Sequence, residues 1–298
     1  MSGRTVGNAI SILVLGSLFA TLCDVVIKMA GAEVAIFQFT FFRALFMCLL
    51  LLPVVTYIYI KNPKVPLLTG LKVHVLRGHL WVLAAILLVV SLAELPLATA
   101  NAVFYTAPIF IVLFAGLFYR ERLGLEAIGA AILGFAGVLL ILRPTEISLG
   151  MVSAIFFAMV LAANSLLIKK IPKQQGMFYG LFITQMCALP LAAGLAIWEA
   201  VELQEEVLLY AVLSSICSII YSVACLIGYR HVDSSKVASA EYSGLIFAVL
   251  FGWWVFGETP DLGLFIGSLL IILPLLYMSR REGRKRRQES VVSPLNNV

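Results

Sequence analysis

Long apolar runs alternate with short charged segments along the whole chain. Ten runs of 16 residues or more contain no Asp, Glu, Lys or Arg: 5–23, 44–60, 78–93, 95–119, 127–142, 147–168, 174–198, 207–229, 242–257 and 262–279. Because the hydrocarbon core of a bilayer requires roughly 20 helical residues, about 17–25, we predict ten transmembrane helices. The three runs of 16 residues, 78–93, 127–142 and 242–257, need long charged neighbours that reach the interface to complete a span.

The composition excludes a water-soluble globule. Of the 298 residues, 62% are hydrophobic and 12% are charged, whereas a soluble domain has roughly 45–50% apolar and about 25% charged residues. The first run has no cleavage pattern of small residues, so we interpret it as a span and not as a removable signal peptide. The five cysteines lie in or beside apolar runs without CxxC spacing, which indicates neither disulfides nor a zinc site.

Basic residues are concentrated in alternate loops. With a cytoplasmic amino terminus, 18 of the 21 Lys and Arg residues fall on the cytoplasmic side, as the positive-inside rule requires. These are Arg4, Lys61, Lys64, Lys72, Arg77, Arg120, Arg122, Lys169, Lys170, Lys173, Arg230, Lys236, Arg280, Arg281, Arg284, Lys285, Arg286 and Arg287. The last cluster could bind nucleic acid, but directly after a span it more often attracts anionic lipid, and we adopt the lipid interpretation. We therefore predict that both termini are cytoplasmic and that the protein binds no nucleic acid.

The opposite side of the membrane carries acidic residues instead. These are Glu33, Glu94, Glu146, Glu199, Glu202, Glu205, Glu206, Glu258 and Asp261. Three basic residues depart from the rule, because Lys28 and Arg143 lie on this side and Arg43 lies within a span. Acidic residues direct topology only weakly, so they agree with the assignment without deciding it.

An internal repeat relates the two halves of the chain. With a shift of 137 and no gap, 97–121 matches 234–258 at seven of 25 positions, including Tyr105 with Tyr242. Seven identities are modest for such apolar sequence, and a second segment supports the match.

The second segment indicates the organisation of the whole chain. A shift of 141 places DVVIK, 24–28, over SLLIK, 165–169. Because each half has five helices, an odd number, the second half enters the membrane from the other side and the repeats are inverted. We expect an all-α membrane protein with ten transmembrane helices in two inverted five-helix repeats, 1–144 and 145–280, followed by a basic cytoplasmic tail, 281–298.

Several short segments resemble those of one transporter family. They are FFRALF (41–46), LRG (76–78), PLATANAVFYTAP (96–108), GFAGVLLILRP (134–144) and AEYSGLIFAVLFGWWVFGETPD (240–261), and their order and spacing are specific. Over nearly its whole length the chain resembles the drug/metabolite transporter superfamily, in its EamA-type ten-helix branch. The resemblance implies a solute carrier of the bacterial inner membrane that works by alternating access. It extends to S-adenosylmethionine uptake and riboflavin carriers, so S-adenosylmethionine, riboflavin and amino-acid-like solutes are the candidate substrates.

Arg43 is the strongest candidate for binding a solute. It follows Glu33 by ten residues, which at about 1.5 Å per residue places it about 15 Å deeper, near mid-membrane. An ionisable group at that depth costs at least about 2.5–3.5 kcal/mol, so it requires a partner, a cavity or a function. A guanidinium can hold a carboxylate or phosphate through two parallel hydrogen bonds. A permanent internal ion pair is an equally good explanation.

Glu241 is the candidate coupling residue. It begins the ninth span, five residues after Lys236, and a carboxyl group that faces an opening and closing cavity can bind and release a proton. The alternative is a fixed ion pair with Arg43 or Lys236. Asp24 and Lys28 are four residues apart on one helix face, so we expect them to neutralise each other.

Uncharged polar and aromatic residues complete the predicted pocket, because solute pockets combine apolar walls with few polar groups. They are Gln38, Asn101, Tyr105, Asn164, Gln185, Tyr242 and Ser239. The two tyrosines are equivalent in the repeat and can stack on a ring or a sulfonium, although aromatic side chains in helices more often serve packing. His79 is interpreted as an interfacial, structural residue.

Other functional classes fit the sequence less well. An intramembrane enzyme would require a nucleophile or a metal set such as HExxH, and the chain has only three His and no such spacing. A passive channel would show charged rings or filter carbonyls, and an ATP-driven pump would show a phosphate loop ending in Gly-Lys-Ser/Thr. We therefore predict a carrier without cofactor or metal. Its expected partners are a small-molecule solute, membrane lipid and a coupling proton, and it acts as a monomer or homodimer.

Overall fold

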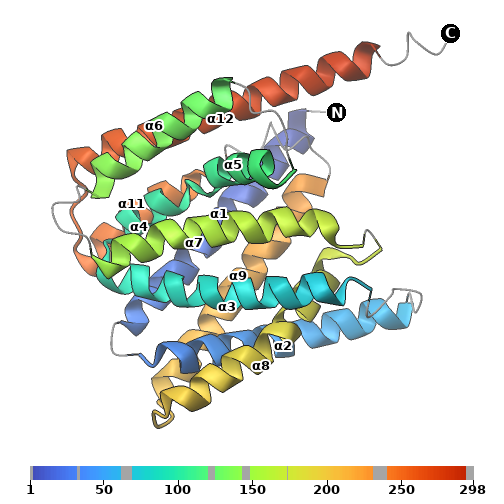
Figure 1. Cartoon of the computed structure of the whole chain (residues 1–298), viewed down its shortest axis with the longest axis vertical. Coiled ribbons are helices and arrows are strands. Elements are labelled where there is room, and N and C mark those ends of the chain that lie inside the picture. Colours follow the sequence, from blue (N-terminus) through green and yellow to red (C-terminus); the bar gives the residue numbers. More distant parts are fainter. Residues whose placement is uncertain are drawn as a thin grey trace.

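Every regular element in the described part of the chain is helical (Figure 1). The computed structural model describes residues 3–31, 34–61, 69–119, 125–142, 148–172, 174–230 and 240–292. Its elements are α1 (Gly3–Ala30), α2 (Ile36–Lys61), α3 (Leu71–Glu94), α4 (Leu97–Phe104), α5 (Ala107–Tyr119), α6 (Leu125–Leu142), α7 (Leu149–Leu167), the 3-10 turn η1 (Ile168–Lys170), α8 (Met177–Glu199), α9 (Glu205–Arg230), α11 (Ser243–Phe256) and α12 (Leu262–Val292). The predicted all-α class is confirmed. Nine residues named in the sequence analysis lie outside the described residues: Glu33, Lys64, Arg120, Arg122, Arg143, Glu146, Lys173, Lys236 and Ser239.

The described helices include seven that are long and apolar enough to cross a membrane. They are Asn8–Ala30, Ile36–Lys61, Leu71–Glu94, Leu97–Phe118, Leu149–Leu167, Met177–Glu199 and Glu205–Ile227, and three shorter apolar helices accompany them: Ile128–Leu142, Ser243–Phe256 and Leu262–Tyr277. The run 78–93 belongs to a full-length span, because α3 already begins at Leu71 and contains both Lys72 and Arg77. The prediction that Lys72 and Arg77 lie in a loop is therefore wrong.

The fourth span is interrupted near its middle. The helix α4 ends at Phe104 and α5 begins at Ala107, with Tyr105 and Thr106 in a turn between them. Pro108 follows directly, and its missing N–H and its ring disfavour a continuous helix at this point. Tyr105, in this turn, is partly buried and its ring contacts that of Tyr242.

Helices from the two halves pack against one another. The pairs in contact are α1 with α9, α2 with α8, α3 with α7 and α6 with α12, and in Figure 1 the α2–α8 and α6–α12 pairs form the two ends of the molecule. Some pairs bring backbone against backbone. A Cβ atom added to Gly78 would lie 2.8 Å from the carbonyl oxygen of Thr184, and one added to Gly137 would lie 2.6 Å from that of Gly267. Only small residues permit such approaches, which are typical of membrane helices.

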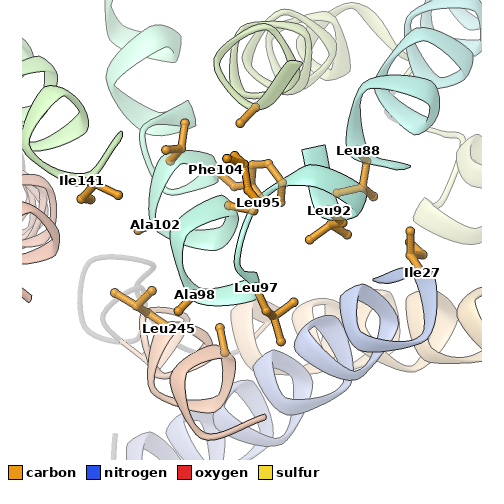
Figure 2. Packing of buried hydrophobic residues seen from close by; sticks show 14 of the residues in the cluster. Ile27, Leu88, Leu92, Leu95, Leu97, Ala98, Ala102, Phe104, Ile141 and Leu245 are labelled. Atoms are coloured by element: carbon orange, nitrogen blue, oxygen red, sulfur yellow. The ribbon is translucent and has the colours of Figure 1, made fainter. Parts of the chain in front are cut away.

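The largest buried cluster surrounds the connection between α3 and α4 (Figure 2). Leu92 and Leu97 have no exposed surface, and the cluster also contains Ile27 of α1, Ile141 of α6 and Leu245 of α11. Because lipid tails are as apolar as leucine, this cluster stabilises the fold by close packing more than by exclusion of water. It fixes the positions of α1, α4 and α11, which carry most of the polar side chains described next.

Candidate functional site

A stripe of polar side chains runs along α1 and faces the interior. Ser17, Thr21, Asp24 and Lys28 are spaced by four, three and four residues, so they lie on one face of the helix. Ser17 and Thr21 are buried, and their hydroxyls donate to the carbonyl oxygens of Glu241 (3.2 Å) and Gly244 (3.1 Å), respectively. The stripe therefore joins α1 to the start of α11.

Arg43 of α2 is buried among neutral partners. Its side chain is 7% exposed, and Nη2 donates to Ser218 Oγ at 3.0 Å and to Cys23 Sγ at 3.4 Å. The Trp81 ring lies 5.7 Å from the guanidinium carbon. Nε has no hydrogen-bond partner among the described residues. Arg43 also forms no ion pair with any acidic side chain that the structure describes, so its hydrogen-bond partners there are neutral.

Asp24 lies close to this arginine but has a different partner. Its carboxylate lies within electrostatic range of the Asn101 side chain and of the Arg43 guanidinium, and it forms no ion pair with Arg43. Asn101 Nδ2 also donates to the carbonyl oxygen of Leu97 at 3.1 Å, which fixes the amide beside α1. The expectation that Asp24 and Lys28 neutralise each other is wrong, because Lys28 pairs elsewhere.

Tyr105 and Tyr242 meet where the two halves approach each other. Their ring centroids are 5.5 Å apart at an angle of 52°, within the range of favourable aromatic pairs. Tyr105 Oη donates to the backbone oxygen of Glu241 at 3.0 Å. The Glu241 carboxylate is partly exposed and accepts a weak hydrogen bond from Cys225 Sγ at 3.6 Å. Both tyrosines sit at turns that precede a helix, so the repeat equivalence seen in the sequence corresponds to a contact in space.

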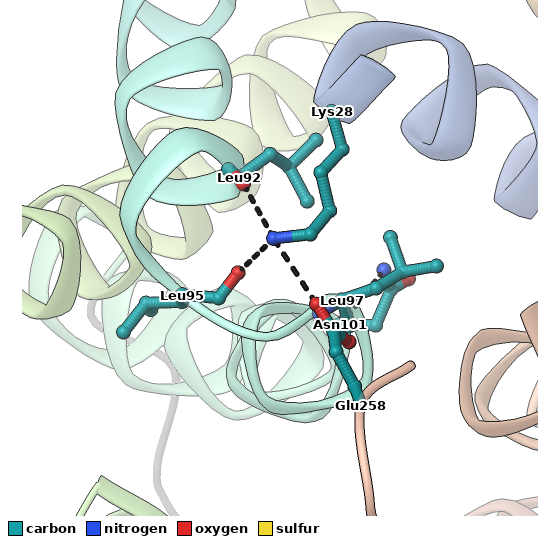
Figure 3. A network of polar contacts seen from close by, with 6 residues as sticks. All are labelled: Lys28, Leu92, Leu95, Leu97, Asn101 and Glu258. Carbon is teal, nitrogen blue, oxygen red and sulfur yellow. Dashed lines mark hydrogen bonds and ion pairs between the residues drawn. The ribbon is translucent and has the colours of Figure 1, made fainter. Parts of the chain in front are cut away.

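Lys28 joins three elements at the end of the bundle that carries the acidic residues (Figure 3). Its Nζ donates to the carbonyl oxygens of Leu92 (2.9 Å) and Leu95 (2.6 Å) and lies 3.2 Å from Glu258 Oε1. The second oxygen of Glu258 accepts from the N–H of Leu97 at 2.7 Å. We call these contacts the Lys28 network. It ties the end of α1, the α3–α4 connection and the segment after α11 together.

Other carboxylates at this acidic end also bind helix N-termini. Glu94 Oε2 accepts from the N–H of Gly150 at 2.6 Å, and Glu199 accepts from the N–H groups of Phe37 (3.3 Å) and Gln38 (2.8 Å). The first N–H groups of a helix have no partner within it and favour negative charge. Glu94 and Glu199, which the sequence places on the non-cytoplasmic side, thus stabilise contacts between helices that are far apart along the chain.

Three predicted pocket residues have hydrogen-bonding environments of their own. Gln38 is at the start of α2, where Nε2 donates to the carbonyl oxygen of Val201 at 3.1 Å. Asn164 accepts from Arg77 Nε at 2.8 Å. Gln185 is completely buried in α8, and its Oε1 has no hydrogen-bond partner among the described residues. Among the described residues, none of the three forms a hydrogen bond or ion pair with Arg43, Asp24, Asn101, Tyr105, Tyr242 or Glu241.

A second polar cluster, which the sequence argument missed, surrounds His74. The imidazole is fully buried, with Nδ1 3.1 Å from Thr184 Oγ1 and Nε2 2.9 Å from Gln175 Oε1. Arg77 Nη1 donates to the same Thr184 oxygen at 3.3 Å. His74, Arg77 and Gly78 follow helical spacing on α3, which is the signal that could have revealed the cluster. It ties α3 to α7 and α8 near the end that carries the basic residues. His79, in contrast, is exposed, and its Nδ1 lies 2.7 Å from Val75 O of its own helix.

Comparison with known proteins places this architecture in a family. The model of the EamA-like transporter family matches residues 7–143 and again 144–280. The S-adenosylmethionine uptake transporter of Rickettsia conorii is 28% identical over 296 residues, covering 96% of this chain and 98% of that protein. The riboflavin transporter of Vibrio cholerae is 29% identical over 224 residues, covering 72% of this chain and 74% of that protein. A crystal structure with 17% sequence identity shares the fold, with a TM-score of 0.57 over 94% of this chain and 99% of the other.

These findings confirm the resemblance noted in the sequence and assign the chain to transporters, not to enzymes. They also agree with a multi-pass membrane protein, because the apolar helices cover most of both matched regions. The chain belongs to the EamA-like transporter family and contains its domain twice.

Proposed function

We propose that the protein is a secondary carrier that moves a small organic metabolite across the bacterial inner membrane by alternating access. Its ten helices then form two inverted five-helix repeats with both termini cytoplasmic. Helix contacts support a two-fold relation between the halves, which the odd number of helices in each half makes an inverted one: shifts of 137 and 141 residues map α1, α2, α3 and α6 onto α7, α8, α9 and α12. The α1–α9 contact becomes α7–α3, the α2–α9 contact becomes α8–α3, and α2–α8 and α6–α12 map onto themselves. A two-fold axis in the membrane plane requires this exchange.

The observation that carries the solute proposal is the charge of Arg43, buried beside Asp24 without an ion pair to it. A solute that carries both charges would pair with each of them. A carboxylate can bind the guanidinium through Nε and Nη, since Nε has no other partner among the described residues. An ammonium can bind the Asp24 carboxylate opposite. The substrate is therefore a zwitterion of the α-amino-acid type.

The aromatic pair extends this site toward a larger solute. Tyr105 lies within electrostatic range of Asp24 and Glu241, and Tyr242, whose ring contacts that of Tyr105, lies within electrostatic range of Glu241. Their ring faces attract a cation such as a sulfonium or stack on a heterocycle. S-adenosylmethionine, the solute named for the Rickettsia relative, contains an amino-acid zwitterion, a sulfonium and an adenine. It is our leading candidate, and riboflavin, which lacks the zwitterion, is the weaker one.

The Lys28 network supplies the closed end that alternating access requires. A pocket of about 420 Å³ opens beside Glu258 and is lined also by Ala98, Thr99 and Asp261. Asn101 lies about one helical turn further along α4 than Ala98. Release of the Lys28 network would connect this pocket to the Asp24 site. In the proposal, this release is the step that exposes the site to the acidic end.

Glu241 is the proton-coupling residue in this proposal. Its carboxylate is partly exposed, while its backbone oxygen receives hydrogen bonds from Tyr105 and Ser17. Protonation at Glu241 thus takes place on the turn where α1, α4 and α11 meet. A change of charge there can alter the contact between the two halves.

Binding measurements on purified protein test the solute proposal. We expect S-adenosylmethionine to bind wild type, and Arg43→Met to weaken binding about tenfold to a hundredfold, the effect of losing a charge-assisted hydrogen bond of about 1.5–3 kcal/mol. Removing the carboxylate from the ligand should weaken wild-type binding equally and leave the Arg43→Met affinity unchanged. Lys72→Met, at an exposed position on α3, is the matched control. If the loss of affinity caused by Arg43→Met and the loss caused by removing the ligand's carboxylate multiply when they are combined, Arg43 does not bind the carboxylate.

Thiol protection provides an independent test of the site. Cys23 Sγ lies 3.4 Å from Arg43 Nη2 and 3.3 Å from Ser218 Oγ, so a solute bound there should slow alkylation of Cys23. Cys48, buried on α2, is the internal control. Equal protection of both cysteines would show a general change in the protein and would contradict a local site.

A further inference from the structure

The helices α6 and α12 cross closely and then diverge. At the crossing, Gly137 and Gly267 bring the two backbones together, since a Cβ on either would lie 2.6 Å from the carbonyl oxygen of the other. Further toward the basic end, a Cβ added to Gly129 would meet nothing within 4 Å. Pro274 interrupts the regular hydrogen bonds of α12 on the facing side. The divergence leaves a wedge between the two helices.

This wedge is an apolar groove of about 400 Å³ on the outer surface of the helix pair. It is lined by Gly129, Ala130, Leu133, Leu269, Leu270, Leu273, Pro274 and Tyr277. Leu133, Leu273 and Tyr277 are exposed. They belong to two of the shorter apolar helices, Ile128–Leu142 and Leu262–Tyr277, so lipid would surround them in a bilayer. The residues that line the groove do not include Arg43 or its partners. Because the lining is apolar, the groove favours an apolar ligand.

A basic segment follows the groove directly. After Tyr277 the sequence reads SRREGRKRR, with Arg280, Arg281, Arg284, Lys285, Arg286 and Arg287, and α12 continues as a helix through it. At about 1.5 Å per residue, Arg280 lies only about 4.5 Å beyond Tyr277 along the axis. Tyrosine is the residue expected at the level of lipid head groups. Along α12 the apolar groove is thus followed by Tyr277 and then by the positive charges. This is the order of the acyl chain, glycerol and phosphate in a phospholipid.

We propose that the α6–α12 groove is a binding site for an anionic phospholipid. One acyl chain occupies the groove, and the phosphate lies at the basic end of α12. A second copy of the chain would present its own basic segment to this one if it packed here in parallel, and like charges would then face each other. The charge pattern therefore favours the lipid.

Native mass spectrometry of purified protein with added phosphatidylglycerol or phosphatidylcholine tests this proposal. We expect wild type to retain phosphatidylglycerol on the order of tenfold to thirtyfold more tightly, as two neighbouring Arg residues contribute at the membrane surface. Gly129→Phe should lose the retained lipid by filling the groove. Gly194→Phe is the matched control, because a Cβ added to Gly194 of α8 would also meet nothing within 4 Å, and Gly194 lies outside the groove. Arg280→Gln with Arg281→Gln should retain lipid but no longer distinguish the two head groups.

Several results would overturn the proposal. Equal lipid retention by wild type and Gly129→Phe would show that lipid does not occupy the groove, and equal loss in Gly194→Phe would show a general effect of phenylalanine. No preference for phosphatidylglycerol in wild type would remove the phosphate contact. A dimeric mass, together with cross-linking between copies through Leu133→Cys, would assign the groove to a second chain. A monodisperse profile on gel filtration with unchanged solute binding confirms that each variant is folded.

Discussion

The Lys28 network makes the sharpest quantitative prediction. Lys28→Met removes the ammonium group but keeps an unbranched side chain of similar length. The carbonyl oxygens of Leu92 and Leu95 then lose their donor, and Glu258 keeps only the N–H of Leu97. The side chains of Lys28 and Glu258 are 13% and 19% exposed, respectively. Solvent therefore does little to screen the charge that Glu258 keeps in the variant.

The magnitude follows from this partial burial. Removing one partner of a buried ion pair costs about 3–5 kcal/mol, since it leaves an uncompensated charge. Glu258→Gln is milder, at about 1–3 kcal/mol, because the amide oxygen can still accept from Leu97 and Lys28 keeps both carbonyl contacts. The double variant leaves neither charge unpaired. We therefore expect its loss of stability to be about 1–3 kcal/mol smaller than the sum of the single losses.

Unfolding of purified protein in detergent measures these values as a double-mutant cycle. Labelling of Thr99→Cys, in the pocket beside Glu258, by an impermeant thiol reagent then reports whether the acidic end has opened. We expect faster labelling in each single variant than in the Thr99→Cys parent. Additivity of the two losses within about 0.5 kcal/mol, with labelling unchanged, would refute the idea that Lys28 and Glu258 hold this end closed.

Further predictions concern packing and coupling. Gly78→Ala should destabilise the protein by about 1–3 kcal/mol, because its Cβ would lie 2.8 Å from the Thr184 backbone. Gly194→Ala, whose Cβ would lie in open space, should be neutral or should stabilise the protein by up to about 1 kcal/mol. Thermal unfolding compares the stability of the two variants. Glu241→Gln should flatten the pH dependence of transport in proteoliposomes, whereas Glu202→Gln, at an exposed loop position, should leave the profile unchanged. A pH profile of Glu241→Gln that follows wild type would exclude Glu241 as the coupling residue.

The helices could be predicted from sequence because hydropathy is a local property. Each charge-free run corresponds to an apolar helix in the structure. Errors arose where charge was treated as a marker of loops. Arg77 is buried because Asn164 and Thr184, more than 80 residues away, provide acceptors inside the bundle, and the positive-inside rule does not include such partners.

The candidate site was predictable where the repeat constrained it. The equivalence of Tyr105 and Tyr242 anticipated two residues that are in contact. Lys28 was predicted to pair with Asp24, because the sequence shows only which residues share a helix face. Its ion-pair partner in the structure, Glu258, belongs to the other half of the chain. His74 was missed for the same reason, since both its partners, Thr184 and Gln175, belong to a distant segment.

Counterflow of labelled S-adenosylmethionine into proteoliposomes loaded with the unlabelled compound tests the central claim most directly. A carrier with a zwitterion site at Arg43 predicts transient, saturable accumulation above equilibrium that is lost in Arg43→Met and retained in Lys72→Met. Uptake that rises linearly with concentration, or accumulation that is identical in wild type and Arg43→Met, would contradict the account.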